Sequence, residues 1–192
     1  MTLLMRATEV MKRPVVTLHG DDIAQVKDIV FEGTGGSVGG FTLAGRGLLA
    51  GPMKEALPWS AVHAFGPHAV MIADETVLQD REAVIAAAQA RESDVMGSRV
   101  ITDDGIDLGP VSDVILEVGD VADVIGYEVD STEALGRDNK RVLIPLPDVL
   151  AVSGEALIVP AAATEFVSDD LAGFGAAVHE FRERLAYGSG ES

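Results

Sequence analysis

The chain has 192 residues, and 47% of them are hydrophobic, which is enough apolar material for a folded core. It carries 31 acidic and 14 basic residues, for a formal net charge of −17. Binding to phosphates requires clustered basic side chains, so we expect no direct nucleic-acid binding and no attraction to anionic lipid surfaces. The length allows one large domain or two small ones.

Cysteine is absent, which excludes disulfides, thiolate metal ligands and cysteine nucleophiles. Residues 1–10 lack the continuous apolar segment of a secretory signal. No apolar stretch approaches the ~20 residues that are needed to cross a bilayer. We therefore expect a cytoplasmic protein without membrane insertion.

The first part of the chain alternates short β-rich runs with turn signals. We predict strands near residues 14–18, 22–32, 37–44, 54–58, 62–65 and 69–72. Gly20, in the turn before the second strand, supplies the positive φ that a tight hairpin requires. Six short strands at this spacing leave no room for βαβ crossovers, so the pattern predicts a small barrel or sandwich.

A helix is predicted next, over residues 77–90, because this segment is rich in alanine and straight-chain residues. Near the end of the chain, residues 168–170 resemble an N-cap followed by an acidic first turn. Apolar residues then recur at helical spacing up to Leu185, which predicts an amphipathic helix over 168–187. The tail, residues 188–192, is expected to be disordered.

The region between the two helices repeats the first one. Residues 11–32 align without a gap on residues 96–117 after a shift of 85 positions. Ordinary residue usage would give about one or two identities in such a window. The eight identical pairs are Met11/Met96, Val15/Val100, Thr17/Thr102, Gly20/Gly105, Asp22/Asp107, Val26/Val111, Asp28/Asp113 and Glu32/Glu117. After small insertions the match continues, and it includes Pro58/Pro145.

The repeat resembles the PRC-barrel domain, a six-stranded β-barrel. The likeness rests on the openings MKRPVVTLHG and MGSRVITDDG, the segments AQVKD and GPVSD, the strand IGYEV and the closing VLIPLPDVLAVSGEALIV. The first copy departs at Ala24, where the second has Gly109. The expected fold is mainly β, with two small six-stranded PRC-type barrels, a linker helix and a C-terminal amphipathic helix. The expected segments are repeat 1 at 1–75, the linker helix at 76–92, repeat 2 at 93–167, the C-terminal helix at 168–187 and the tail at 188–192.

The resemblance implies an interaction module without a conserved active site. Similar domains occur in the photosynthetic reaction centre H subunit, in a ribosome maturation factor and in archaeal cell-division adaptors. We therefore expect a non-catalytic adaptor or scaffold that binds other proteins, a second copy of itself included. The alternative is a small-ligand or metal sensor that uses a cleft between the barrels. An assembly factor for ribosomal or membrane complexes ranks below both.

Several motifs resemble catalytic, nucleotide-binding or metal-binding signatures. Residues 35–39 match the G-x-S-x-G nucleophile elbow around Ser37, and residues 45–50 match the dinucleotide fingerprint, but neither is followed by the helix that its chemistry needs. His63 and His68, with Asp74, lack compact metal-ligand spacing. We expect no catalytic residue, cofactor site or metal site.

Two sets of residues have other predicted roles. Asp28 and Asp113 lie among apolar strand residues at matched positions, and we expect each carboxylate to bond to backbone at a strand bend, with a catalytic pair as the alternative. The structural repeat positions are Asp28, Asp113, Gly20, Gly105, Pro58 and Pro145. The apolar stripe of the C-terminal helix is expected to pack on its own barrel, with docking on a partner as the alternative. Its candidate docking residues are Leu171, Phe174, Val178 and Phe181.

Overall fold

The computed structural model describes residues 2–32, 36–88, 90–136, 140–147, 151–153 and 156–188. The chain divides into two units. The repeat-1 unit contains Ala7–Gly33 and Ser37–Ser93, and the repeat-2 unit contains Met1–Arg6, Thr34–Gly36 and Asp94–Ser192. Residues 2–6, which precede the repeat-1 unit in the chain, thus pack with the repeat-2 unit.

The repeat-1 unit has strands at all six predicted places. They are β2 (Pro14–Thr17), β3 (Asp22–Glu32), β4 (Ser37–Ala44), β5 (Pro52–Pro58), β6 (Ala64–Phe65) and β7 (Val70–Ile72). The sheet order is β4-β3-β2-β7-β6, with β5 on the other side of β4. Strands β2 and β7 run parallel, whereas the other neighbours in this order are antiparallel.

The predicted linker helix is shorter than its composition suggested. Helix α2 covers Arg81–Ala87 alone, and the short strand β8 (Gln79–Asp80) precedes it. The cause is a tertiary contact, because Gln79 and Asp80 pair with β5 and therefore adopt strand conformation. The Asp80 carboxylate then caps α2 by accepting a hydrogen bond from the Ala83 amide, at 3.1 Å.

The repeat-2 unit reproduces the same topology. Its strands are β10 (Arg99–Thr102), β11 (Asp107–Val118), β12 (Ala122–Asp130), β13 (Arg141–Pro145), β14 (Ala151–Ser153) and β15 (Ala156–Val159). The order is β14-β15-β10-β11-β12, with β13 on β12. As β2 does with β7, β10 runs parallel to β15. The turns also agree with the prediction, since Gly20 and Gly105 have φ of 94° and 89°.

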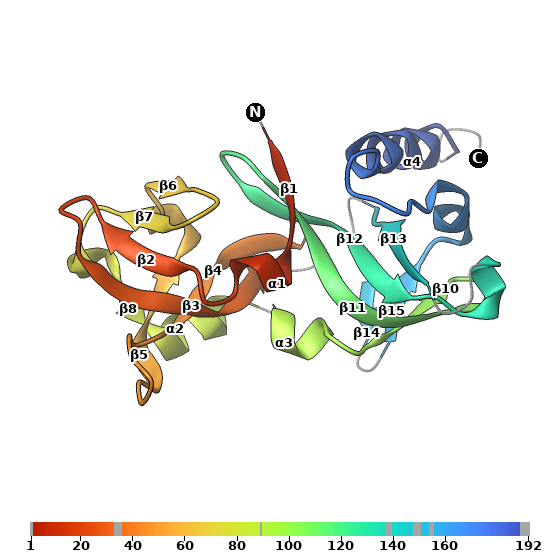
Figure 1. Ribbon diagram of the computed structural model, residues 1–192. Helices are drawn as coiled ribbons and strands as arrows, with labels where there is room; N and C mark the ends of the chain where they lie inside the picture. Colours follow the sequence, from red (N-terminus) through yellow and green to blue (C-terminus); the bar gives the residue numbers. More distant parts are fainter. Residues whose placement is uncertain are drawn as a thin grey trace. The chain divides into compact units, whose positions relative to one another are not determined.

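Each repeat is also joined by a strand that the sequence analysis did not predict. Strand β1 (Leu3–Arg6) lies antiparallel to β11, with Arg6 opposite Ile115 (Figure 1). Strand β9 (Ala90–Arg91) lies antiparallel to β3, with Arg91 opposite Val30. A shift of 85 positions relates these two pairings, so they are equivalent. The short helices α1 (Ala7–Val10) and α3 (Glu92–Val95) follow these strands at equivalent positions.

The C-terminal helix α4 covers Phe174–Gly188 and therefore begins later than predicted. Ser168, expected at its N-cap, instead forms a β-bridge with Leu143. Gly188, assigned to the tail, is the last residue of α4, and residues 189–192 lie outside the described residues. The helix covers the repeat-2 sheet at β12 and β13 (Figure 1).

Candidate functional site

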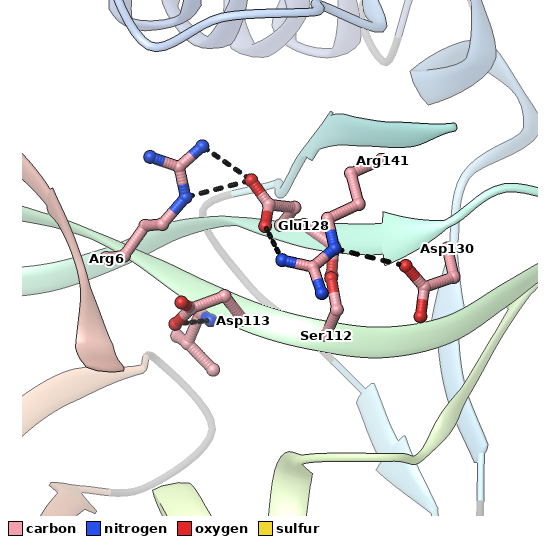
Figure 2. Close-up of polar contacts among 7 residues, drawn as sticks. Arg6, Ser112, Asp113, Glu128, Asp130 and Arg141 are labelled. Atoms are coloured by element: carbon pink, nitrogen blue, oxygen red, sulfur yellow. Dashed lines mark hydrogen bonds and ion pairs between the residues drawn. The ribbon is translucent and has the colours of Figure 1, made fainter. Parts of the chain in front are cut away.

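The most distinctive polar group of the repeat-2 unit surrounds Glu128 on β12. Its side chain is 5% exposed. Arg6 of β1 donates from Nε and from Nη2 to the same oxygen, Oε2, at 2.9 and 2.6 Å. Arg141 of β13 approaches the other oxygen, with Nη1 3.8 Å from Oε1 (Figure 2). A buried carboxylate needs such partners, because an unpaired buried charge is costly.

The cluster extends along the strands around Glu128. Nε of Arg141 lies 3.4 Å from Oδ1 of Asp130. The Ser112 hydroxyl donates to the backbone carbonyl of Glu128, at 3.2 Å (Figure 2). Arg6 comes from a different part of the chain than the other members, so the cluster fastens the N-terminal strand to the repeat-2 unit. Sequence reasoning missed it, because neither the spacing nor the repeat places Arg6 beside Glu128.

Asp28 and Asp113 occupy identical places in the two units. Asp113 Oδ1 accepts a hydrogen bond from the Val114 amide at 2.8 Å, and Asp28 Oδ1 accepts one from the Ile29 amide at 2.9 Å. Both residues lie where the pairing register shifts, Asp28 in the β3–β4 pair and Asp113 in the β11–β12 pair. Each carboxylate therefore binds backbone at a bulge of its strand, which is the role expected for it.

The two matched prolines lie opposite matched glycines. Gly40 is paired with Pro58 across β4 and β5, and Gly126 is paired with Pro145 across β12 and β13. A Cβ atom on Gly40 would be 2.4 Å from the Leu57 carbonyl oxygen. The strands approach too closely for a side chain there, so these repeat positions have a packing role.

The apolar stripe of α4 is covered by its own unit. Phe174, Val178 and Phe181 are buried, and Phe174 and Val178 join Ile115 in a core cluster against which Leu171 packs. The ring of Phe181 also contacts that of Phe166, with centroids 5.6 Å apart. We do not retain the docking hypothesis for this stripe, because these side chains are already occupied by intramolecular packing.

A strand, and not a helix, follows each motif that resembles a catalytic or nucleotide-binding signature, and Gly35 of the first motif lies outside the described residues. Ser37 is the first residue of β4 and is followed by strand, so the nucleophile-elbow context is missing. Residues 45–51 form the turn between β4 and β5, where the Gly45 amide donates to the Gly51 carbonyl at 3.1 Å. His63 and His68 are exposed, and the described residues contain no cluster of three His, Cys, Asp or Glu that could hold a metal ion.

The repeat-1 unit contains an aromatic cluster. Buried Phe41 contacts half-buried Trp59 and Phe65, with ring centroids 6.0 and 5.9 Å away. The Arg13 guanidinium lies 4.7 Å from the centroid of Phe65 and donates to the Gly66 carbonyl at 2.9 Å. Burial lowers the pKa of Arg13 from its ordinary value. Trp59 and Phe65 thus lie at the half-buried rim of the repeat-1 core.

An exposed apolar tip lies at the turn between β4 and β5. Leu48 and Leu49 have relative exposures of 105% and 101%, so neither side chain contacts the rest of the unit appreciably. Gly47, with φ of 112°, turns the chain just before them. Arg46 precedes Gly47, and its Nη2 lies 2.8 Å from Oδ2 of Asp22. We name residues Leu48 and Leu49 the leucine tip.

The repeated topology, with matched bulges and matched glycine–proline pairs, defines a tandem of small, mainly β domains. The family model of the PRC-barrel domain matches residues 4–78 and 89–165. The chain therefore belongs to the PRC-barrel family and contains two such domains. A search of curated proteins finds no match. No helix among the described residues is long and apolar enough to cross a membrane.

Proposed function

We propose that this protein is a non-catalytic adaptor or scaffold of the cytoplasm, and that the leucine tip is its docking element for another protein. The observation that carries the proposal is the full exposure of Leu48 and Leu49, side by side in one turn. Burying a leucine side chain contributes roughly 1.5–3 kcal/mol, so the folded chain does not gain this stabilisation from Leu48 or Leu49. The same two side chains would supply that energy to a complex.

The chemistry of the tip specifies the kind of partner. Two adjacent leucines on a narrow turn fit an apolar pocket rather than a flat surface. The chain around them has a formal net charge of −17, which favours a partner with a neutral or basic rim and opposes anionic membranes. The proposed partner is therefore a protein that has an apolar pocket.

The test compares tagged chains in affinity capture followed by identification of the bound proteins. We expect the wild-type chain to retain a protein that the double variant Leu48→Ser, Leu49→Ser loses by about tenfold or more, as two buried leucines would require. The matched control is Leu18→Ser, since Leu18 is 53% exposed in the same unit. Equal capture by the wild type and the double variant, or equal loss in the control, would contradict the proposal.

A small-ligand sensor is the second candidate, and one observation favours it. An open pocket in the repeat-1 unit lies between β5 and α2, and its charged lining residues are Lys54, Arg81, Asp80 and Glu82. The Nε atom of Arg81 is buried and has no hydrogen-bond partner in the structure. Thermal shifts across a panel of metal ions and anionic metabolites test this function. A shift that Arg81→Ala abolishes would support it, and a flat panel would reject it.

A further inference from the structure

The edge of β11 accepts a strand that is distant in sequence. Pairing runs from Leu3 opposite Val118 to Arg6 opposite Ile115. Met5 is 4% exposed, and Leu4 packs against the core cluster of the repeat-2 unit. Backbone pairing, apolar contacts and the ion pair with Glu128 together make this a β-augmentation surface, with the N-terminal strand as its occupant.

We propose that the edge of β11 also takes Leu3–Arg6 from a second copy of this chain, which gives a dimer with exchanged N-terminal strands. Each copy would place its Arg6 on Glu128 of the other copy and its Met5 in the other core. The contacts are those that the structure shows within one chain, so the exchange creates no new interface chemistry. The proposal is independent of the leucine tip.

The repeat itself supports this use of the edge. Strand β9 lies on β3 in the register of β1 on β11, with Arg91 and Arg6 at equivalent positions. In both units, the added strand comes from the segment that precedes the other repeat in the chain. Accepting a strand from outside the repeat is therefore a property of the PRC repeat in this protein.

The connection of β1 to the rest of the chain favours exchange. Arg6 belongs to the repeat-2 unit and Ala7, the first residue of α1, to the repeat-1 unit. Strand β1 ends at Arg6 and helix α1 begins at Ala7, so no loop residue separates these two elements. Short connections of this kind favour the exchange of an identical element between copies, because an exchanged arrangement relieves the constraint on the connection.

Glu128 makes the edge selective for this strand. At the equivalent place in repeat 1, opposite the bulge residue Asp28, stands Thr42, whereas Glu128 is opposite Asp113. The β11 edge therefore prefers a strand that carries Arg6 at its end, because a buried carboxylate needs a cationic partner. The chain's own N-terminal strand meets this requirement.

The absence of native cysteine allows a direct test with two variants of the full chain. Leu3→Cys is made in an affinity-tagged chain and Val118→Cys in an untagged one, and the two are mixed in a redox buffer, both directly and after refolding together. Opposed residues in antiparallel strands have Cα atoms about 4.5–5.5 Å apart, a separation that a disulfide spans. The matched control replaces Val118→Cys with Glu117→Cys, whose side chain is on the opposite face of β11.

We expect a disulfide-linked heterodimer of tagged and untagged chains from the 3–118 pair and about tenfold less from the 3–117 pair. Adding Glu128→Gln to the untagged chain should lower the yield several-fold, because the exchanged Arg6 then loses its ionic partner. A single chain that carries both Leu3→Cys and Val118→Cys reports the intramolecular arrangement. If that chain closes its disulfide while the mixed chains give no heterodimer even after refolding together, the exchange does not occur.

The oligomeric state of the unmodified protein provides an independent readout. Light scattering across a concentration series should show a dimer of the 20.1 kDa chain that deletion of residues 2–6 abolishes. A dimer that survives the deletion is held by another surface and overturns the proposal. A synthetic strand of another sequence that binds the deleted chain as tightly as the native segment would overturn the selectivity for a second copy.

Discussion

Gly126 lies against the ring of Phe174, so closely that a Cβ atom on Gly126 would be 2.3 Å from Cζ of the ring and 2.6 Å from the Ile144 carbonyl oxygen. The ring belongs to α4, and the oxygen belongs to the neighbouring strand β13. Because Gly126 has no side chain, β12 can pair with β13 and the C-terminal helix can pack against the sheet.

The first prediction follows from this contact. Gly126→Ala should lower the free energy of unfolding by on the order of 3 kcal/mol, because the backbone oxygen cannot move as a flexible side chain does. Denaturant unfolding followed by circular dichroism measures the change. The control is Gly173→Ala, where an added Cβ meets nothing within 4 Å. Similar losses in both variants would contradict the role of the Gly126 contact.

The second prediction concerns the ion pair that holds the N-terminal strand. Arg6→Ala should cost about 2–3 kcal/mol in the free energy of unfolding, since among the described residues Glu128 then keeps the more distant Arg141 as its cationic partner. Arg141→Ala should cost about 1 kcal/mol or less, because its side chain is 68% exposed and screened by water. Chemical denaturation of the two variants compares them. Equal costs would show that Arg6 is not the principal partner.

The third prediction is a loss of stability at alkaline pH. Burial raises the pKa of the Tyr127 phenol well above its ordinary value. The unfolded chain, where this group has a pKa of about 10, releases the proton first, so the folded state binds more protons above that pH. The free energy of unfolding should therefore fall by about 1.4 kcal/mol per pH unit above pH ~10 on account of this residue.

Tyrosinate absorbance measures the titration directly. The chain has two tyrosines, so a single substitution separates their contributions. Tyr127 is 3% exposed and should ionise only as the chain unfolds, because burial disfavours its charged form. Tyr127→Phe should remove the late step and its share of the alkaline destabilisation. Ionisation of Tyr127 in the folded protein would disprove the assignment.

The fourth prediction concerns the matched aspartates. Asp113→Ala should lower the free energy of unfolding by about 1–3 kcal/mol, because the buried Val114 amide loses its acceptor. Asp113→Asn keeps an oxygen at that place and should cost less. Asp28→Ala and Asp28→Asn form the same comparison in repeat 1, where the single tryptophan, Trp59, reports unfolding by fluorescence. If the alanine and asparagine variants were equally unstable, the carboxylate would have a role other than accepting this bond.

Local patterns predicted the elements that depend on local interactions. The six strand positions of repeat 1 followed from alternation and turn residues, and Gly20 and Gly105 have the positive φ expected of them. The helices were less predictable at their ends. Alanine-rich composition extended α2 too far toward the N-terminus, because composition does not show that β8 pairs with β5.

The Glu128 cluster illustrates what sequence patterns cannot show. Arg6 and Glu128 are 122 residues apart, and the repeat alignment started at Met11, after the segment that carries Arg6. The equivalence of Arg6 and Arg91 became visible only when β1 and β9 were seen in the same register. A repeat search that extends a few residues upstream of the gapless block would have found this pair.

The sequence by itself determined that the chain contains two PRC repeats, because short β-rich runs and turn glycines are local properties that survive in each copy. It also determined the acidic charge and the absence of cysteine. Only the tertiary structure decided which unit each leading strand joins, since strand pairing depends on which edges meet in space. The tertiary structure also decided that the apolar stripe of α4 packs against β12 and β13. It decided as well that the buried carboxylate of Glu128 is paired with Arg6 of the N-terminal strand.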